Sequence, residues 1–404
     1  MSEPTHDLVV YGATSFVGQI MCRYLVERHG TAGDLRWAIA GRNAEKLEQV
    51  AADTGADVPH IVADAADRAA LDQMVASTAV VASTVGPYAL YGSELVAAVV
   101  EAGRDYCDLT GEPQWMRRMI DAHQDRAVET GARIVHACGF DSVPSDLGVW
   151  FLQQQATEQF GAPCPTVRMG VKSAKGGFSG GTTASIMNLL AESADDPEVD
   201  ALIADPYALA PPDSRTGPEQ PDVTWPEYDE GLGAWQAPFV MAPTNTKVVF
   251  RSHGLLAHRW GRDFTYGESV LTGDGLRGRA AALAVAGGVE GFTGAARFGP
   301  VRSLLDRVLP DPGEGPTPEK QEAGHYDLRF VGRTEAGDTI TVRVAGDRDP
   351  GYGSTARILG ESAVCLGATP RSDVGGGFWT PATAMGDALS ERLEAHAGLT
   401  FEVL

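Results

Sequence analysis

Short apolar runs alternate with amphipathic stretches along the first 136 residues of the chain. The strand-like runs cover residues 8–11, 35–40, 59–63, 80–85, 106–109 and 133–136, and helical patterns begin near Phe16, Ala44, Arg68, Gly92 and Gln114. Short buried strands separated by amphipathic helices predict βαβ units around a parallel sheet. Because such crossovers are right-handed, the pattern predicts a doubly wound α/β domain.

The pattern changes beyond Gly139. Alternating runs at 247–250, 262–272, 326–334 and 339–345 predict antiparallel strands. A strand is also predicted over 166–172, a helix over 184–193, a long irregular segment over 206–243, a rigid loop at 309–315 (LPDPGEG) and a final helix over 352–365. We therefore expect a second, α+β domain with a mixed or antiparallel sheet.

The length and net charge of the chain indicate how many domains it can form and which partners it is expected not to bind. Its 404 residues suffice for two domains. The net charge of −22 repels nucleic acids and anionic lipids, so we expect neither as a partner. Five cysteines lie scattered without a CxxC pair, and the N-terminal MSEPTHD lacks the regions of a signal peptide. Both features predict a cytoplasmic protein with reduced thiols.

One stretch, Ala280–Ala296, is rich in small apolar residues but is interrupted by Glu290. A membrane-spanning helix needs about 20 mostly apolar residues, so we expect no transmembrane span. The stretch instead predicts a buried helix or a pocket wall, and shallow contact with a membrane stays open.

A glycine turn follows the first predicted strand, within DLVVYGATSFVG at residues 7–18. Gly12 and Gly18 allow a tight turn and a close approach to a pyrophosphate, whose charge meets the N-terminus of the next helix. Ser15 stands where the usual fingerprint has glycine, and its hydroxyl can donate to a phosphate. The context predicts a dinucleotide site, although a sheet domain that has lost its nucleotide would show the same pattern.

Arg42, at the end of the second strand in WAIAGRN, indicates which dinucleotide binds. NAD-preferring proteins usually carry an acidic residue there, whereas a guanidinium suits the 2'-phosphate of NADPH. Asn43 and Lys46 complete a small polar cluster, in which Asn43 is also a candidate helix N-cap. Asp64 ends the third strand, where it either accepts from the adenine amino group or caps a helix.

Two polar segments follow later strands. In STVGPYALY, residues 83–91, the Gly86-Pro87 pair predicts a stiff turn beside the nicotinamide. Tyr88 follows and presents its phenol to the reaction centre or simply packs. In GFDSVPSDLG, residues 139–148, Asp141 and Ser145 are candidate catalytic residues, because substrate clefts commonly form at domain junctions. Local helix capping explains part of this polarity equally well.

A rival motif, GFSGG at 177–181, fits the GxSxG elbow of hydrolases, with His325 or His396 as a triad partner. A hydrolase would leave the dinucleotide domain without a purpose, and glycine-rich turns also bring N–H groups to ligands. The chain has no tyrosine followed four positions later by lysine, so the usual relay of short-chain dehydrogenases is missing. Its histidines show no close ligand spacing, so we predict no metal site.

With these segments in view, the chain resembles the saccharopine dehydrogenase-like reductases, in particular the branch that includes trans-acting enoyl reductases. The resemblance spans nearly the full length and is carried by YGATSFVG, AGRN, STVGPYALYG, DYCDLTGE, GFDSVPSDLG, KGGFSGGT, LPDPGEG and GFWTPATAMG. It implies an NADP-binding Rossmann domain (1–145), a second domain with substrate and homodimer contacts (146–350), and a C-terminal segment (351–404) that packs back on the first domain.

The resemblance also implies which residues bind the cofactor. Cofactor roles carry over to Gly12, Thr14, Phe16, Val17, Gly18, Arg42, Asn43, Asp64, Gly86 and Pro87, and the local patterns add Ser15, Lys46 and Thr84.

The sequence thus predicts an NADPH-dependent oxidoreductase that reduces the double bond of an enoyl, lipid-like acyl substrate. One alternative is reduction of an imine or carbonyl in an amino-acid-like substrate, which the arginines of segment 251–262 would favour. Another is a non-catalytic NADPH-binding partner protein.

Overall fold

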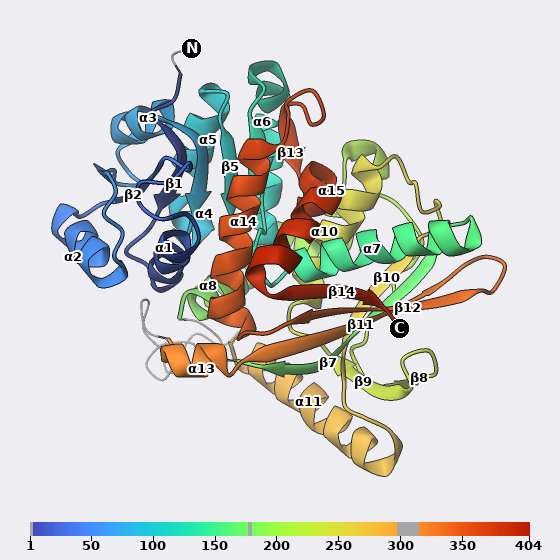
Figure 1. Cartoon of the computed structure of the whole chain (residues 1–404). Helices are drawn as coiled ribbons and strands as arrows, with labels where there is room; N and C mark the ends of the chain where they lie inside the picture. The colour runs from blue at the N-terminus through green and yellow to red at the C-terminus, as the bar shows by residue number, and fades with distance from the viewer. Residues whose placement is uncertain (1–2, 177–179, 297–314) are drawn as a thin grey trace.

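The computed structural model describes residues 3–176, 180–296 and 315–404. Seven parallel strands form the first sheet, in the order β13-β6-β5-β4-β1-β2-β3 (Figure 1). They are β1 (His6–Tyr11), β2 (Trp37–Gly41), β3 (His60–Val62), β4 (Thr78–Ser83), β5 (Asp105–Asp108), β6 (Arg133–Val135) and β13 (Gly377–Trp379). The order 3-2-1-4-5-6 is that of a doubly wound dinucleotide-binding sheet, and its direction of winding reverses between β1 and β4.

Helices cover both faces of this sheet, because alternate residues of each strand point to opposite sides. Val10 of β1 belongs to the core with α1 (Phe16–His29), α2 (Ala44–Thr54) and α14 (Thr355–Ala368). Its neighbour Val9 belongs to a second core with α3 (Arg68–Ala76), α5 (Ser93–Glu101) and α6 (Pro113–Thr130). The short α4 (Tyr88–Tyr91) precedes α5.

The second sheet is mixed, in the order β14-β12-β11-β7-β10-β9-β8. Its strands are β7 (Thr166–Lys175), β8 (Glu227–Asp229), β9 (Ala234–Pro238), β10 (Thr265–Leu271), β11 (His325–Arg333), β12 (Thr339–Gly346) and β14 (Leu399–Val403). β7 and β10 pair in parallel and the other neighbours pair antiparallel. The predicted fold class, a doubly wound α/β domain beside an α+β domain, is confirmed.

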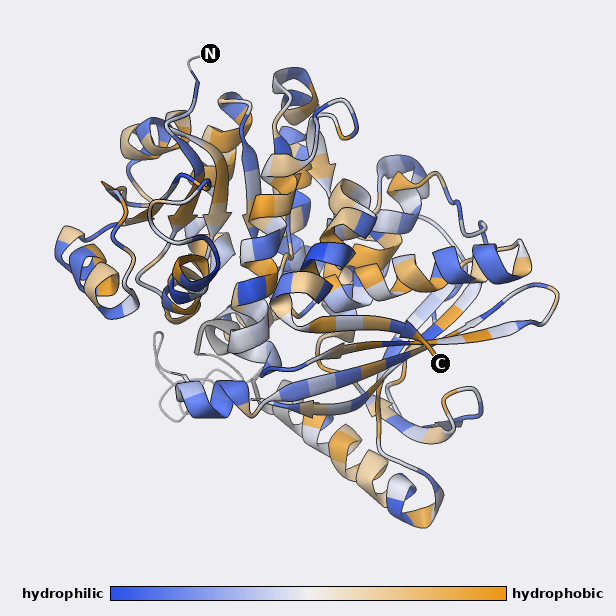
Figure 2. Cartoon of the chain, in the orientation of Figure 1, coloured by the Kyte–Doolittle hydropathy of each residue, from blue (hydrophilic) through white to orange (hydrophobic). Residues whose placement is uncertain are grey.

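Helix α7 (Val143–Phe160) packs on β11 and β12 and joins the two sheets through one continuous core. Hydrophobic positions concentrate on the strands and inner helix faces, and hydrophilic ones on outer elements such as α13 (Figure 2). The remaining elements are α8 (Gly180–Asp195), α9 (Pro197–Ala204), η1 (Pro212–Ser214), α10 (Ala242–Leu255), α11 (Gly275–Ala296), α13 (Pro318–Glu322), η2 (Pro350–Ser354), α15 (Pro381–Arg392) and η3 (Leu393–Ala397).

Two local predictions from the sequence are wrong. The run 247–250 is not a strand but the middle of α10, since four apolar residues suit a buried helix face as well as a strand. The helix predicted at 352–365 is not the final one, because α15 follows it. Of the two alternatives for the small-residue stretch 280–296, the structure supports the pocket wall: the stretch lies in α11, whose described side chains are mostly exposed, and Ala286, Val289 and Glu290 line a cavity.

Other predictions are refined or lie outside the described residues. The irregular segment 206–243 also contains η1, β8 and β9. Residues 309–314 of the predicted rigid loop are not among those described. No helix within the described ranges is long and apolar enough to cross a membrane.

Candidate dinucleotide and substrate site

Two glycines form the tight turn between β1 and α1. Gly12 has a φ of +87°, and a Cβ there would lie 2.6 Å from Val85 Cγ2. A Cβ on Gly18 would lie 2.3 Å from the carbonyl oxygen of Gly12, so α1 approaches the turn more closely than any side chain allows. Both positions require glycine, as the fingerprint of a dinucleotide-binding turn predicts.

The hydroxyl of Ser15 has a structural task. Its Oγ accepts from the amide of Gly18 at 2.9 Å and so caps α1. It also lies 2.9 Å from Thr84 Oγ1, which in turn donates to the carbonyl of Gly12 at 2.8 Å. Because Thr84 has one hydroxyl proton, the proton between the two side chains comes from Ser15. The predicted donation from Ser15 to a phosphate is therefore not available in this arrangement, and the two hydroxyls instead join the glycine turn to the end of β4.

The start of α1 still offers donors to an anion. The amides of Thr14, Phe16 and Val17 make no backbone hydrogen bond within the described ranges, as expected at a helix N-terminus. The ring of Phe16 packs edge-on against Tyr352 with 4.8 Å between centroids, which fixes the first residue of the helix. Three free N–H groups at the positive end of α1 suit a pyrophosphate.

Arg42 lies at the end of β2, exposed to solvent. Its side chain makes no hydrogen bond or ion pair with another residue of the described ranges, which leaves the guanidinium free to bind a ligand phosphate. Asn43 caps α2 by accepting from the amide of Lys46 at 2.9 Å, and the Lys46 side chain is exposed. Asp64 makes a turn with the amide of Ala66, while the helix that follows is capped by another residue, Asp67.

A buried carboxylate, Glu112, holds the loop after β4. It accepts from the amides of Tyr88 and Ala89 at 2.8 and 2.9 Å and from Ser185 Oγ of α8 at 2.8 Å. Burial raises the pKa of this carboxyl. Glu112 thereby fixes the residues that directly follow the Gly86-Pro87 turn, whose peptide bond is cis.

Tyr88 has a packing role in this arrangement. Its hydroxyl donates to the carbonyl of Ser83 at 3.0 Å and accepts from the amide of Leu109 at 3.1 Å. The ring packs against Trp115 and is buried, and burial raises the pKa of the phenol well above its usual value. These contacts argue against the catalytic role predicted for Tyr88, because the hydroxyl is already committed to the backbone on both sides.

Asp141 lies where the two sheets and α14 meet. The preceding residue, Phe140, packs on Tyr326 of β11 and donates its amide to Thr355 of α14 at 3.0 Å. Asp141 itself remains partly exposed, yet the surrounding protein raises the pKa of its carboxyl to about 6. A partly accessible carboxyl that titrates near neutral pH is suited to hold and release a proton.

Ser145, the other predicted catalytic residue, is buried close to Glu268 of β10, where its hydroxyl favours the lower pKa of that carboxyl against the effect of burial. Glu268 also accepts from Tyr266 Oη at 2.7 Å and from Asn245 Nδ2 at 2.9 Å. Burial raises the pKa of Glu268 to about 7. The hydroxyl of Ser142 donates to Asn245 Oδ1 at 3.1 Å, which links this network to the residue next to Asp141.

Sequence reasoning missed Glu112, Asn245 and Glu268. Each is a lone polar residue in its own segment, and it becomes part of the site only when β5, α10 and β10 come together. The available signal was weak: a carboxylate inside an apolar strand, as in YGESVL, is a candidate for a buried role.

The remaining candidate residues are those of the hydrolase motif and of the alternative substrate site, and the structure describes some of them. Residues 177–179 of the GxSxG motif lie outside the described residues. His396 Nε2 bonds to Arg28 at 2.8 Å. Arg251, offered for a substrate carboxylate, is buried and donates to the carbonyls of Leu209 and Phe378 at 2.6 and 2.7 Å. Within the described ranges no cluster of side chains could hold a metal ion.

The sheet order, the glycine turn and the free amides of α1 define a dinucleotide-binding protein of the doubly wound class. Comparison with known proteins identifies the family within this class. Residues 8–135 match the family model for the saccharopine dehydrogenase NADP binding domain.

Full-length relatives extend this match. A Mycobacterium tuberculosis protein provisionally named a trans-acting enoyl reductase is 43% identical, over 98% of this chain and 97% of its own. Proteins named trans-acting enoyl reductase from Mycobacterium bovis and Mycobacterium ulcerans are 40% and 39% identical, over 97% and 96% of this chain and 96% and 95% of their own. The chain belongs to this family of saccharopine dehydrogenase-like, NADP-binding oxidoreductases, which confirms the resemblance.

Solved structures agree on the fold alone. Apo saccharopine dehydrogenase (L-Glu forming) from Saccharomyces cerevisiae superposes with a TM-score of 0.52 at 13% identity, over 99% of this chain and all of that one. The NAD complex of homospermidine synthase from Legionella pneumophila gives 0.52 at 10% identity, over 99% and 91%.

Proposed function

We propose that the protein is an NADPH-dependent reductase that saturates the carbon–carbon double bond of an enoyl thioester. The observation that carries the cofactor assignment is the glycine turn of Gly12 and Gly18 together with Arg42 at the end of β2, whose side chain has no partner in the part of the chain that the structure describes. The names of relatives at 39–43% identity support the choice of an enoyl group.

The residues of the first domain would bind and orient the cofactor. The free amides of Thr14, Phe16 and Val17 meet the pyrophosphate, and Arg42 meets the 2'-phosphate with charge-assisted hydrogen bonds. The Gly86-Pro87 turn, fixed by Glu112, forms the wall near the sheet's switch point. Bound NADPH would supply the hydride that adds to the β-carbon of the enoyl group.

Asp141 is the proposed source of the proton for the α-carbon. It lies in the junction between the sheets, and a carboxyl with a pKa of about 6 keeps part of its protons near neutral pH. Asp141→Asn should lower kcat at least tenfold and remove the fall in rate above pH 6. Unchanged turnover and an unchanged pH profile in this variant would point to water or another donor.

The reaction is tested with NADPH deuterated at nicotinamide C4 and a crotonyl thioester. We expect oxidation of NADPH, with deuterium found at the β-carbon of the saturated product. Oxidation only with imino or keto acids would favour the alternative substrate class, although Arg251 is not free to bind their carboxylates. Tight NADPH binding without turnover on any of these substrates would instead indicate a non-catalytic binding protein.

A further inference from the structure

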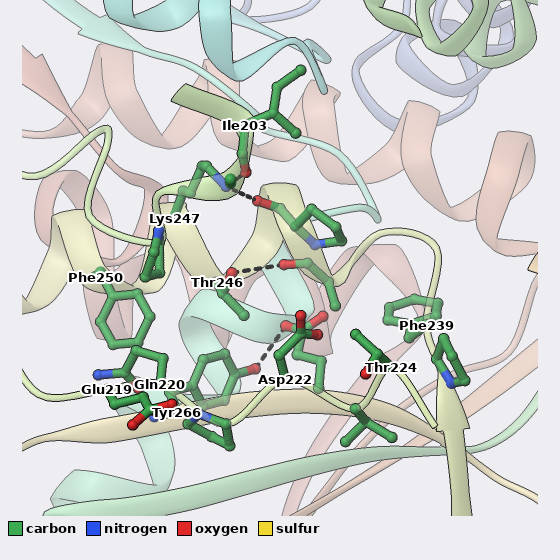
Figure 3. A pocket seen from close by; sticks show the side chains of 18 of the residues that line it. Ile203, Glu219, Gln220, Asp222, Thr224, Phe239, Thr246, Lys247, Phe250 and Tyr266 are labelled. Carbon is green, nitrogen blue, oxygen red and sulfur yellow. Dashed lines mark hydrogen bonds between the residues drawn. The ribbon is translucent and has the colours of Figure 1, made fainter. Parts of the chain in front are cut away.

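A cavity of about 960 Å³ is lined by residues of α10, α11, β10 and the irregular segment after α9. Figure 3 shows part of this lining, including Thr246, Phe250 and Tyr266. Apolar side chains, among them Pro206, Val223, Phe239, Phe250 and Val289, make up the larger part of its walls, and the carboxylates of Glu219, Asp222, Glu268 and Glu290 also lie in the lining. The volume lies within the range of small-molecule pockets, about 300–1,000 Å³. The cavity is therefore large enough for a chain of many carbon atoms.

The cavity lies one helical turn from the loop that follows β5 of the first sheet. Pro243, in the first turn of α10, lines the cavity, and Thr244 of the same turn donates to the carbonyl of Gly111 after β5 at 3.2 Å. Glu268, also in the lining, connects through Asn245 to Ser142 at the junction that holds Asp141. A substrate whose reacting carbons lie at this junction would extend into the cavity.

Lys247 is an unusual residue in such a lining. Its side chain is 2% exposed, and Nζ donates to the carbonyls of Ile203 and Pro243 at 2.7 and 2.8 Å (Figure 3). Burial lowers the pKa of Lys247 to about 8, against the opposing effect of the nearby carboxylates of Asp205 and Asp222, so the amine is mainly protonated at neutral pH. A protonated amine has three donors, and its hydrogen bonds to the described residues use only two of them.

The third N–H of Lys247 restricts which ligands can fill the cavity. A plain hydrocarbon against it would leave a buried, charged donor without an acceptor, which costs more than the usual penalty for an unpaired group. An oxygen on the chain would accept this hydrogen bond, while the apolar walls contact the rest of the chain.

We propose that this cavity binds the distal part of the acyl chain, and that Lys247 selects chains that carry a hydroxyl or carbonyl oxygen over the unsubstituted hydrocarbon. The proposal rests on the proposed reduction of an acyl thioester. It makes Lys247 a specificity residue and gives it no part in the transfer of hydride or proton.

Saturated thioesters test the selection without turnover. The probes are the N-acetylcysteamine thioesters of dodecanoic acid and of its hydroxy and oxo derivatives substituted at each position from carbon 5 to carbon 11. Calorimetry on the NADPH complex should show at least one oxygenated probe binding tenfold tighter than the dodecanoyl parent. Lys247→Met should abolish that preference and leave the affinity of the parent unchanged or higher. No preference in the native protein, or a preference that survives in Lys247→Met, would overturn the proposal.

A second variant tests the cavity independently, because Lys247→Met also removes a link between α9 and α10. Val223→Trp fills the wall and should weaken the dodecanoyl probe at least tenfold, while the butanoyl probe and NADPH bind as before. Leu283→Trp on the exposed face of α11 is the matched control. Equal binding of the dodecanoyl probe by native protein and Val223→Trp would place the chain elsewhere.

Reduction of the short crotonyl thioester separates the two proposals. If crotonyl reduction is normal but neither variant changes binding of long probes, the cavity proposal fails and the reductase function stands. If the long probes behave as expected but no enoyl thioester is reduced, the chain site stands and the proposed reaction fails.

Discussion

Glu268→Gln should change how the stability of the protein depends on pH. Glu268 is 4% exposed and its pKa is raised from 4.5 to about 7 by burial. A carboxyl whose pKa is higher in the folded state favours folding when it is protonated. Its contribution is therefore complete below about pH 4.5 and is lost as the pH rises through about 7. At 1.36 kcal/mol per pKa unit, the loss amounts to about 3 kcal/mol.

The substitution removes this dependence and adds a nearly constant cost. Glutamine has only one oxygen for the donors on Tyr266 and Asn245, so we expect a loss of about 1–3 kcal/mol at every pH. Urea unfolding at pH 5 and pH 8 should show native protein losing about 2.5 kcal/mol more than the variant, because part of the loss has already occurred at pH 5. Glu219→Gln, which removes an exposed carboxylate from the same cavity, is the control. Parallel pH curves for native protein and Glu268→Gln would refute the reasoning.

Three further substitutions test the first domain. Arg42→Ala should weaken NADPH binding roughly 10- to 100-fold, since a charge-assisted hydrogen bond contributes about 1.5–3 kcal/mol, and should leave NADH binding and the stability of the fold unchanged. The control is Arg23→Ala, which removes another exposed arginine. Equal losses of affinity for both cofactors in a titration would exclude a contact with the 2'-phosphate. Gly18→Ala should abolish NADPH binding, because its Cβ would lie 2.3 Å from the Gly12 carbonyl; an unaltered affinity would show that α1 can shift. Tyr88→Phe should lower the free energy of unfolding by about 1–3 kcal/mol and keep kcat within tenfold, whereas a thousandfold fall in kcat with the fold intact would restore its catalytic assignment.

Much of the first domain could be predicted because its signals are local. Gly12, Gly18 and the cap at Asn43 are each read from a few consecutive residues, and alternation of strands and helices gives the parallel sheet. The apolar run at 247–250 was misread because its four residues carry no period that separates helix from strand.

The inner part of the site could not be predicted in this way. Glu112 meets Ser185 across 73 positions of sequence, and Ser142 meets Asn245 across 103. The packing of helices and strands determines which of these residues meet, and a single polar residue in a strand does not indicate its partner. Ser15 shows the converse: its place in the glycine turn can be predicted from neighbouring residues, but its proton is used by Thr84, which lies 69 positions away.

The segment from β13 to β14 belongs to both sheets, with residues 377–379 beside β6 and residues 399–403 beside β12. During synthesis on the ribosome, each sheet therefore lacks one of its two edge strands until this last part of the chain has emerged. Loss of the segment would leave both sheets incomplete at once, so a shortened chain should fail in both halves of the molecule rather than in one.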